Sequence, residues 1–572
     1  MPGGSPGLAP EGASAVHDYR ANVFRAGHPH LTDDTGGQQP RPPLSLRAVG
    51  LPALLALLAL AGVAPTAAAA TPSPPPYVPG VVVVGYSGAT RPAAQAAIAR
   101  AARATDPVDL EGEAHLLTLH RGADIPATLA RLRHTPGVAW AVPDYVAREA
   151  TMPSAPSLEN PSPPAALQAE AASALTESAT PAATAAGGSS STAAGGSSPA
   201  AAGSPSSAPL QANAAALPGE PFPNDPGTAK TPGGWGQLQW NFNTTFGVGA
   251  PQAWNNLIAD HAAGGRGVVV AVLDTGVAYA NRGPFRRSPD FYPYQFVAGY
   301  DFVAHSRFPN DRNGHGTDVA GTIAEATDNG IGLTGLAYGV RLMPVRVLNA
   351  EGNGDAATIA RGVRFAVDHG ARVINLSLEF PTGITASDIP ELISALRYAN
   401  RHRVVVVAAA GNEAHAAAAY PARAPDVIAV GATTEHGCLA SYSNYGTGVT
   451  LVAPGGGPDA PLPGDPNCHP ELPSGRDVFQ VTFTGTSPRK FGIPNGYEGT
   501  SMATPHVAAT AALVIASGVL GRHPTPRQVA RRLIATARPL GGPGDRRLYG
   551  AGLLDAAAAT APGGPGAVHG GR

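Results

Sequence analysis

The sequence predicts an α/β fold in which helices cover a mainly parallel central sheet, with a small α/β domain before it. Two observations predict this fold. Short apolar runs rich in Val, Ile and Leu recur between residues 267 and 431, and helix-like stretches separate several of them. Such alternation is typical of parallel strands joined by helical crossovers. A smaller set of strand and helix patterns lies over residues 76–150, and low-complexity sequence separates it from the first set.

The composition of the chain excludes a role driven by charge. The 572 residues exceed the length of one ordinary domain, so several segments are expected. Charged residues make up only 14% of the chain and the formal net charge is -2, so no basic field attracts nucleic acid or an anionic membrane. We therefore expect no nucleic-acid partner.

An apolar run near the N-terminus predicts export. Residues 51–64 are almost entirely Leu, Ala and Val, two arginines lie upstream, and the small residues 66–70 follow. A basic flank, a short apolar stretch and an Ala-x-Ala exit are typical of a signal peptide, which we assign to residues 44–70. The alternative is an uncleaved anchor, although the run is short for a membrane span. Residues 1–43 form an N-terminal extension, so either the signal is extended or the start codon lies downstream of Met1.

The elements of the small domain follow from local patterns. Runs rich in β-branched and apolar residues predict strands over 81–86, 115–119 and 138–142. An Ala- and Arg-rich stretch and a helically spaced apolar stretch predict helices over 94–104 and 125–134. Alone, these patterns indicate only a compact domain with an open sheet and two helices.

Low-complexity sequence follows this domain. Residues 151–217 are rich in Ala, Ser, Gly and Pro, and the hexapeptide Ala-Ala-Gly-Gly-Ser-Ser occurs twice. Because little apolar bulk offsets the entropy of ordering, we expect a flexible linker. Ordered patterning resumes over residues 218–560, and a Gly-, Pro- and Ala-rich tail, residues 561–572, closes the chain.

The main domain carries the functional candidates. Its apolar runs predict strands over 267–273, 342–348, 373–378, 404–409 and 427–431, with helices over 358–369 and 391–402. In such a sheet, functional residues lie at the carboxyl ends of the strands.

Three residues form a candidate catalytic group. Asp274 directly follows the first strand, His315 lies between two glycines, and Ser501 opens an apolar helical run whose N-terminus can stabilise an oxyanion. Each alone is more often structural. Together they form a system in which histidine activates the serine hydroxyl and a carboxylate orients the histidine. A strand that ends in Asn412 offers a side-chain N–H for the oxyanion.

Residues 223–559 resemble the subtilisin-like peptidase family. The resemblance rests on Asp-Thr-Gly, His-Gly-Thr, Ala-Ala-Gly-Asn and Gly-Thr-Ser-Met-Ala-Thr-Pro-His-Val, which are jointly very specific. It implies a three-layer subtilisin-like fold and a serine endopeptidase that needs no catalytic cofactor. By the resemblance, Asp274 orients the base, His315 is the general base and acid, Ser501 is the nucleophile and Asn412 stabilises the oxyanion. We expect a secreted, monomeric enzyme that acts on proteins and peptides.

The small domain resembles the propeptide inhibitor of these enzymes, most clearly over residues 132–146. In that family the propeptide assists folding and then occupies the active site until it is cleaved away. The resemblance therefore implies an autoprocessed zymogen. The mature N-terminus stays open between residues 150 and 222.

The pocket for the residue before the cleaved bond is also inferred by resemblance. Two positions depart from the family pattern: Asp318 replaces a common histidine, and Glu379 replaces a usual glycine. Small residues favour a roomy pocket for large side chains, whereas Glu379 and Glu413 favour basic ones, unless both carboxylates face solvent. The residues assigned to this pocket are Ser377, Leu378, Glu379, Ala410, Gly411, Glu413, Ala419 and Ala422.

Calcium is the structural cofactor that the resemblance implies. Asp225, Asp290 and Asn329 match calcium-binding positions of calcium-stabilised relatives, and oxygen ligands suit this hard cation. Because Asp and Asn are also common in turns, a purely structural role stays open. Asp301 and Asp311 are candidates for a second ion.

The chain has two cysteines, Cys438 and Cys468. Given export, we expect a disulfide between them rather than free thiols. No zinc-ligand spacing is present.

Two rival functions stay open. One is a degenerate subtilisin fold that serves as a binding module, although no member of the catalytic group is missing. The other is a dedicated processing protease with one or few protein substrates, retained at the cell surface.

Overall fold

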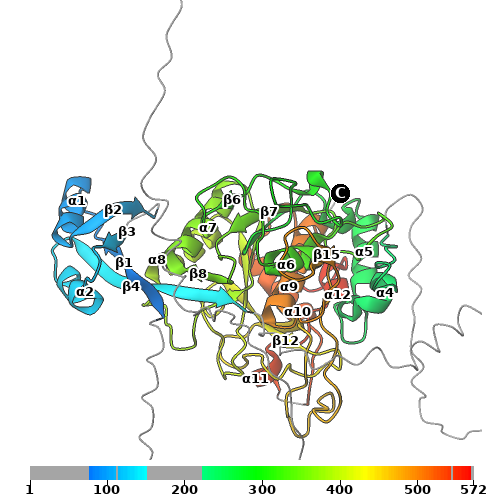
Figure 1. Ribbon diagram of the computed structural model, residues 1–572. Helices are drawn as coiled ribbons and strands as arrows, with labels where there is room; N and C mark the ends of the chain where they lie inside the picture. Colours follow the sequence, from blue (N-terminus) through cyan, green and yellow to red (C-terminus); the bar gives the residue numbers. More distant parts are fainter. Residues whose placement is uncertain (1–75, 111–113, 151–221, 543–544, 568–572) are drawn as a thin grey trace, which may run out of the picture. The chain divides into compact units, whose positions relative to one another are not determined.

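The computed structural model describes residues 76–110, 114–150, 222–542 and 545–567, all within one compact unit, Ser73–Arg572 (Figure 1). The predicted extension, the signal peptide 44–70 and the linker 151–217 lie outside the described residues. A search of these described ranges finds no helix both long and apolar enough to cross a bilayer.

The small domain is an antiparallel sheet with two helices on one face. Its strands, in the spatial order β4-β1-β3-β2, are β1 (Tyr77–Tyr86), β2 (Ala104–Asp109), β3 (Ala114–Leu119) and β4 (Val138–Glu149). Its helices are α1 (Pro92–Ala101) and α2 (Ile125–Arg133). Alternate residues of β1 separate the two faces: Val82 and Val84 pack under the helices, and Val81 and Val83 pack on the other side. The predicted strands and helices are present, and β2 is an additional strand.

A seven-stranded sheet, in the order β13-β12-β11-β9-β5-β7-β6, forms the centre of the main domain. All of its pairings are parallel, as the alternating pattern predicts. The strands are β5 (Val269–Asp274), β6 (Tyr300–Asp301), β7 (Arg341–Arg346), β9 (Val373–Leu376), β11 (Val405–Ala409), β12 (Val427–Thr433) and β13 (Leu451–Pro454).

Helices cover both faces of this sheet and complete the three layers. Val270 and Val272 of β5 face one apolar cluster, and Ala271 and Leu273 face the other, because successive side chains of a strand point to opposite faces. The first cluster includes α5 (Ala250–Ala259), α6 (His315–Ala324), α9 (Thr500–Ser517), α10 (Pro526–Thr536) and α12 (Ala556–Thr560). The second includes α7 (Ala356–Asp368) and α8 (Pro390–Arg401). Each buried Val or Leu side chain contributes about 1.5–3 kcal/mol.

The remaining elements are short. They are α4 (Gly234–Leu238), η1 (Trp240–Phe242), η2 (Ala263–Gly265), η3 (Pro293–Gln295), β8 (Asn353–Asp355), β10 (Leu378–Glu379), β14 (Thr482–Phe483), β15 (Phe491–Gly492) and α11 (Arg546–Tyr549).

The last strand of the small domain pairs with the main domain. The C-terminal part of β4 lies between β10 and β8 and is antiparallel to both. Main-chain hydrogen bonds therefore join the end of the small domain to two edges of the main domain.

Candidate active site

Asp274 and His315 meet where a strand ends and a helix begins. Asp274 is the last residue of β5 and is fully buried, and His315 is the first residue of α6. Gly314 just before it has φ of 115°, a value that glycine adopts without strain. The Nδ1 atom of His315 lies 2.7 Å from Oδ1 of Asp274. This contact fixes the orientation of the imidazole.

The charge of His315 depends on two carboxylates. Burial favours the neutral imidazole, but Asp274 and Glu149 outweigh burial and raise the pKa of His315 to about 9. Glu149 belongs to β4, and its Oε2 lies 4.0 Å from Nδ1 of His315. The docked end of β4 therefore places a second carboxylate beside the imidazole, which favours its protonated form.

Ser501 lies in the first turn of α9, beside α6 (Figure 1). Its hydroxyl donates a hydrogen bond of 3.0 Å to the main-chain oxygen of Ser377. The Nε2 atom of His315 is buried and has no hydrogen-bond partner among the described residues. Transfer of the serine proton to this nitrogen therefore requires the Ser501 side chain to rotate.

Asn412 presents a free N–H. Its Oδ1 accepts hydrogen bonds from the main-chain N–H of Thr500, at 3.0 Å, and from the Thr500 hydroxyl, at 2.8 Å. These bonds fix the amide, and its Nδ2 is buried with no partner in the described part of the chain. An amide held in this way can donate to an oxygen that develops negative charge.

The end of β4 occupies this site like a bound peptide. The N–H of Ala150 donates to the main-chain oxygen of Ser377 at 3.3 Å, and the carbonyl of Ala150 accepts from the N–H of Ser501 at 3.0 Å. Glu149 donates its N–H to Gly352 at 2.8 Å. The carbonyl group of Ala150 therefore lies at the position where a serine nucleophile would attack.

Asp144 of β4 contributes a second contact between the small domain and the main domain. Its Oδ1 accepts from the N–H of Ala357, in the first turn of α7, at 3.1 Å. Burial, Asp355 and Glu391 raise the pKa of Asp144 well above its ordinary value. Burial also raises the pKa of Glu391 to about 8. The carboxyl groups of Asp144, Asp355 and Glu391 thus lie close together at this contact.

Of the predicted pocket residues, Ser377, Leu378, Glu379 and Glu413 contact the end of β4 or Ala150. Ser377, Leu378, Ala410, Gly411, Ala419 and Ala422 are buried. The Glu379 side chain is 1% exposed, so the interpretation that both carboxylates face solvent is wrong for Glu379, whereas the Glu413 side chain is 25% exposed. Burial and the neighbouring Glu413 raise the pKa of Glu379 to about 8, against the opposing effect of Arg148.

Sequence reasoning did not identify Arg148, Glu149 and Thr500 as site residues. Thr500 holds Asn412, and Arg148 and Glu149 reach the pocket and the imidazole. For Arg148 and Glu149, the available signal was their position directly before Ala150, at the end of a domain that resembles an inhibitor.

Asp318 is buried on α6, and both of its carboxylate oxygens lack a partner within the described ranges. Burial raises its pKa well above the ordinary value, an effect that His315 opposes. Burial of Asp318 therefore favours its protonated form.

The three residues predicted to bind calcium come together. Asp225 accepts from the N–H of Asn329 at 3.0 Å, and the Asn329 amide donates to Asp290 at 2.7 Å. Burial raises the pKa of Asp290 to about 8, and Asp225 adds to this effect. Nearby, Glu325 has a buried Oε2 with no partner in the described chain. These oxygen donors and unneutralised acids fit a hard cation.

Neither these acids nor other side chains of the described chain form a recognisable metal-binding cluster. Among the described residues, no group of three or more His, Cys, Asp or Glu side chains is arranged to hold a metal ion. Asp301 pairs with Arg346 at 3.1 Å, and Asp311 accepts a hydrogen bond from the Thr275 hydroxyl. Both carboxylates predicted for a second ion therefore have protein partners.

Cys438 and Cys468 form the predicted disulfide. It encloses part of the long segment before Ser501, and both cysteines pack in an apolar cluster that includes Tyr549. The hydroxyl of Tyr549 donates to Asp465, inside the enclosed segment, at 2.5 Å.

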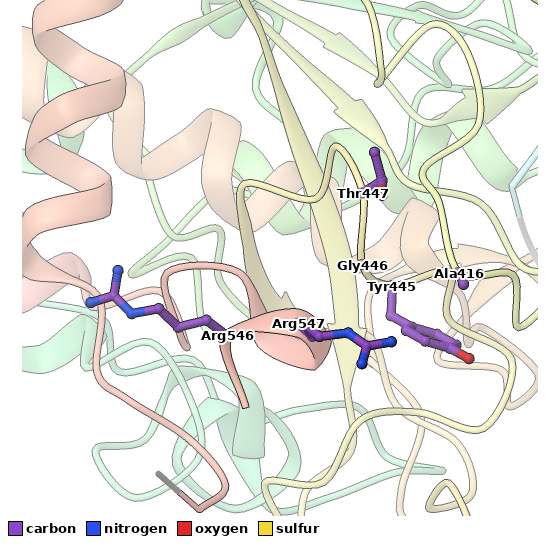
Figure 2. Close-up of a pocket in the computed structure, with 6 residues that line it drawn as sticks. All are labelled: Ala416, Tyr445, Gly446, Thr447, Arg546 and Arg547. Atoms are coloured by element: carbon purple, nitrogen blue, oxygen red, sulfur yellow. The ribbon is translucent and has the colours of Figure 1, made fainter. Parts of the chain in front are cut away.

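A separate cavity of about 370 Å³ shares no residue with the site described above. Figure 2 shows that Arg547 extends toward Tyr445, whereas Arg546 points away from it. The cavity is lined by Ala416, Tyr445, Gly446, Thr447, Arg546 and Arg547.

The fold and the matched motifs define a serine endopeptidase of α/β architecture. The model of the subtilase family matches residues 265–552, and that of the fervidolysin N-terminal prodomain matches residues 63–144. The chain belongs to the subtilase family.

Two relatives found by sequence agree with this assignment. The chain is 38% identical to Subtilisin Savinase from Lederbergia lenta over 317 aligned residues. This alignment covers 55% of this chain and 96% of the relative. It is equally identical to an alkaline protease from Alkalihalobacillus alcalophilus, over 55% of this chain and 68% of that protein. A solved protease structure from Pseudoalteromonas arctica, with 30% identity and a TM-score of 0.46, covers 59% of this chain and 98% of that one.

Proposed function

We propose that this chain is a secreted serine endopeptidase made as an autoprocessed zymogen, with Asp274, His315 and Ser501 as its catalytic triad. The observation that carries the proposal is the contact between the Ala150 carbonyl and the N–H of Ser501. A peptide carbonyl at a nucleophile and an oxyanion donor is the arrangement that acyl transfer requires.

The proposed reaction proceeds through an acyl-enzyme. Asp274 holds His315, which takes the proton of Ser501 as its hydroxyl attacks the substrate carbonyl. The N–H of Ser501 and Nδ2 of Asn412 stabilise the oxyanion. His315 then protonates the leaving amine, and water hydrolyses the ester by the same steps in reverse.

The first substrate is the chain itself. The position of Ala150 supports cleavage of the bond between Ala150 and Thr151, which sets the mature N-terminus at Thr151. After this cleavage, the end of β4 stays paired with β8 and β10 and continues to occupy the site. The small domain is therefore an intramolecular inhibitor until it dissociates.

Structural calcium is part of the proposal. Asp225, Asp290 and Asn329 would hold the ion, which would supply positive charge to a group of buried acids. Export rests on the pattern of residues 44–70, and a disulfide agrees with an oxidising compartment.

The test compares secreted wild type with Ser501→Ala by N-terminal sequencing and mass spectrometry. Wild type should begin at Thr151, and Ser501→Ala should accumulate as the uncut precursor. The control is Ser517→Ala, which removes a hydroxyl from the other end of α9, where it contacts only the main chain of Val514 and Val519, and should be processed normally. Normal processing of Ser501→Ala would refute autocatalysis, and casein hydrolysis by that variant would refute the nucleophile.

A further inference from the structure

Arg148 is the third residue before the bond that the proposed function cleaves, counting Ala150 as the first. The pairing of Arg148 with Glu379 and of Glu149 with Leu378 sets this register, together with the contact of Ala150 to Ser377. Side chains of a strand alternate, so Ala150 and Arg148 point to the same side. That side contains the predicted specificity pocket.

The guanidinium of Arg148 binds two carboxylates of the main domain. Its NH2 atom lies 2.7 Å from Oε1 of Glu413 and 3.2 Å from Oε1 of Glu379. Its Nε donates to the same Glu379 oxygen at 3.3 Å. Arginine suits such a site because its fork presents several donors to carboxylates at once.

Groups of the main domain also hold the two carboxylates in place. Oε2 of Glu379 accepts from the N–H of Asn412 at 3.2 Å. Oε2 of Glu413 accepts from the Asn444 amide at 3.0 Å, and this amide also donates to the main chain of Ala410 at 2.9 Å. The pair is therefore built into the wall of the site rather than loosely attached to the surface.

This arrangement needs a cation. With β4 docked, Glu379 is buried and one guanidinium contacts both acids, and neighbouring like charges disfavour each other's ionised form. A substrate guanidinium relieves that repulsion, whereas a neutral side chain leaves an acid that must keep its proton.

The same carboxylates restrict the residue next to the cleaved bond. A Cβ atom added to Gly411 would lie 2.4 Å from Oε2 of Glu379 and 3.0 Å from Oε2 of Glu413. The acids therefore fill the space beside Gly411, one of the small residues that predicted a roomy pocket. Ala150, which occupies the first position, is fully buried.

We propose that Glu379 and Glu413 make this peptidase select substrates with arginine at the third position before the cleaved bond and a small residue at the first. The inference rests on the proposed function, since it names the substrate class of that site. It distinguishes this chain from a general degradative enzyme, because most peptide bonds lack this combination.

The first experiment needs no catalysis. Hydrogen exchange of the segment 146–150 is measured in the full chain carrying Ser501→Ala, alone and combined with Arg148→Gln or Glu379→Gln. Both variants should lower the protection of this segment about tenfold, the value expected for a charge-assisted contact whose arginine is half exposed. The control, Glu351→Gln, removes an exposed acid just before β8 and should change nothing. Unchanged protection in both variants would overturn the inference.

The second experiment measures kcat/KM of the processed enzyme on quenched peptides. One carries residues 146–152, Val-Ala-Arg-Glu-Ala-Thr-Met, and the second replaces its arginine by glutamine. The third keeps that glutamine and carries arginine instead of alanine at the first position. The first peptide should be cleaved about tenfold faster than the second, and Glu379→Gln should abolish the difference while Glu351→Gln preserves it.

The outcomes separate the two claims. Equal rates for the first two peptides, or fastest cleavage of the third, would overturn the proposed selectivity. Absence of all cleavage, of casein as well as of the peptides, would refute the proposed function. In that case the exchange experiment alone decides whether the two acids recognise arginine.

Discussion

Replacing Asn412 by alanine tests how much the proposed reaction depends on one buried N–H. The amide is fixed through its oxygen by Thr500, and its Nδ2 has no partner within the described residues. Loss of one oxyanion donor in a subtilisin lowers kcat about 10²–10³-fold, or about 2.7–4 kcal/mol, and we carry this range over from that family to Asn412→Ala. KM should change little, because the donor acts mainly on the transition state.

The substitution also affects the folded state, and the two effects can be separated. Alanine removes both acceptor contacts to Thr500, each worth about 0.5–1.5 kcal/mol, so stability should fall by about 1–3 kcal/mol. Asn412→Asp keeps the acceptor and removes only the N–H, so it should retain most of the stability and lose at least as much kcat. Thr500→Val is the matched control: it loses the hydroxyl contacts to Asn412 and to the N–H of Gly411 but leaves Nδ2 in place, and kcat should stay within about fivefold of wild type.

The assay combines kcat and KM on one peptide with the free energy of unfolding from denaturant titration. A folded Asn412→Ala enzyme whose kcat lies within about threefold of wild type would refute the role of this N–H. Equal losses of kcat in Asn412→Ala and Thr500→Val would instead attribute the effect to packing at the start of α9.

Three further predictions follow from buried groups. While the small domain is docked, burial and the neighbouring Asp355 and Glu391 raise the pKa of Asp144, and after dissociation Asp144 is solvated. Docking therefore takes up a proton. The docked state should weaken as pH rises above about 4, the usual pKa of Asp. Asp144→Asn should remove this dependence, measured as the activation half-time of the precursor between about pH 5 and pH 9; an unchanged pH profile would contradict it. Calcium present at 100 times its Kd would stabilise the folded state by about 2.7 kcal/mol, so a chelator should remove this stability and lower Tm. An unchanged Tm would exclude the ion. Cys438→Ser should lower the free energy of unfolding by about 3–4 kcal/mol, because the disulfide joins cysteines 30 residues apart. Denaturant titration should give the same loss for this variant and for reduced wild type. An unchanged free energy of unfolding would contradict the prediction.

The central fold could be predicted because its signals are local. Each long strand of the sheet is an apolar run, and Asp274 directly follows such a run in the sequence and ends β5 in the structure. His315 and Ser501 follow glycines within motifs, and both lie in the first turns of helices. Strand ends and glycine-led helix starts are features that a sequence pattern carries by itself.

The short strands could not be predicted, because pairing alone creates them. β8 and β10 have three and two residues, and neither carries an apolar or alternating pattern long enough to indicate a strand. They form where β4 supplies hydrogen-bond partners on both sides. β2 contains Pro107 and two aspartates, residue types that strands disfavour, and pairing with β3 overrides that preference.

The environment of Glu379 illustrates the same limit at the level of one side chain. A glutamate in place of a usual glycine is equally compatible with a solvent-facing acid and with a buried one. What decides between them is Arg148, which is 231 residues away in the sequence and reaches Glu379 only because β4 pairs with β10. A buried carboxylate is tolerable where a cation and main-chain N–H groups compensate it, and the prodomain supplies that cation. Processing separates that cation from the main domain, and under the proposed selectivity an arginine of the substrate takes its place beside Glu379.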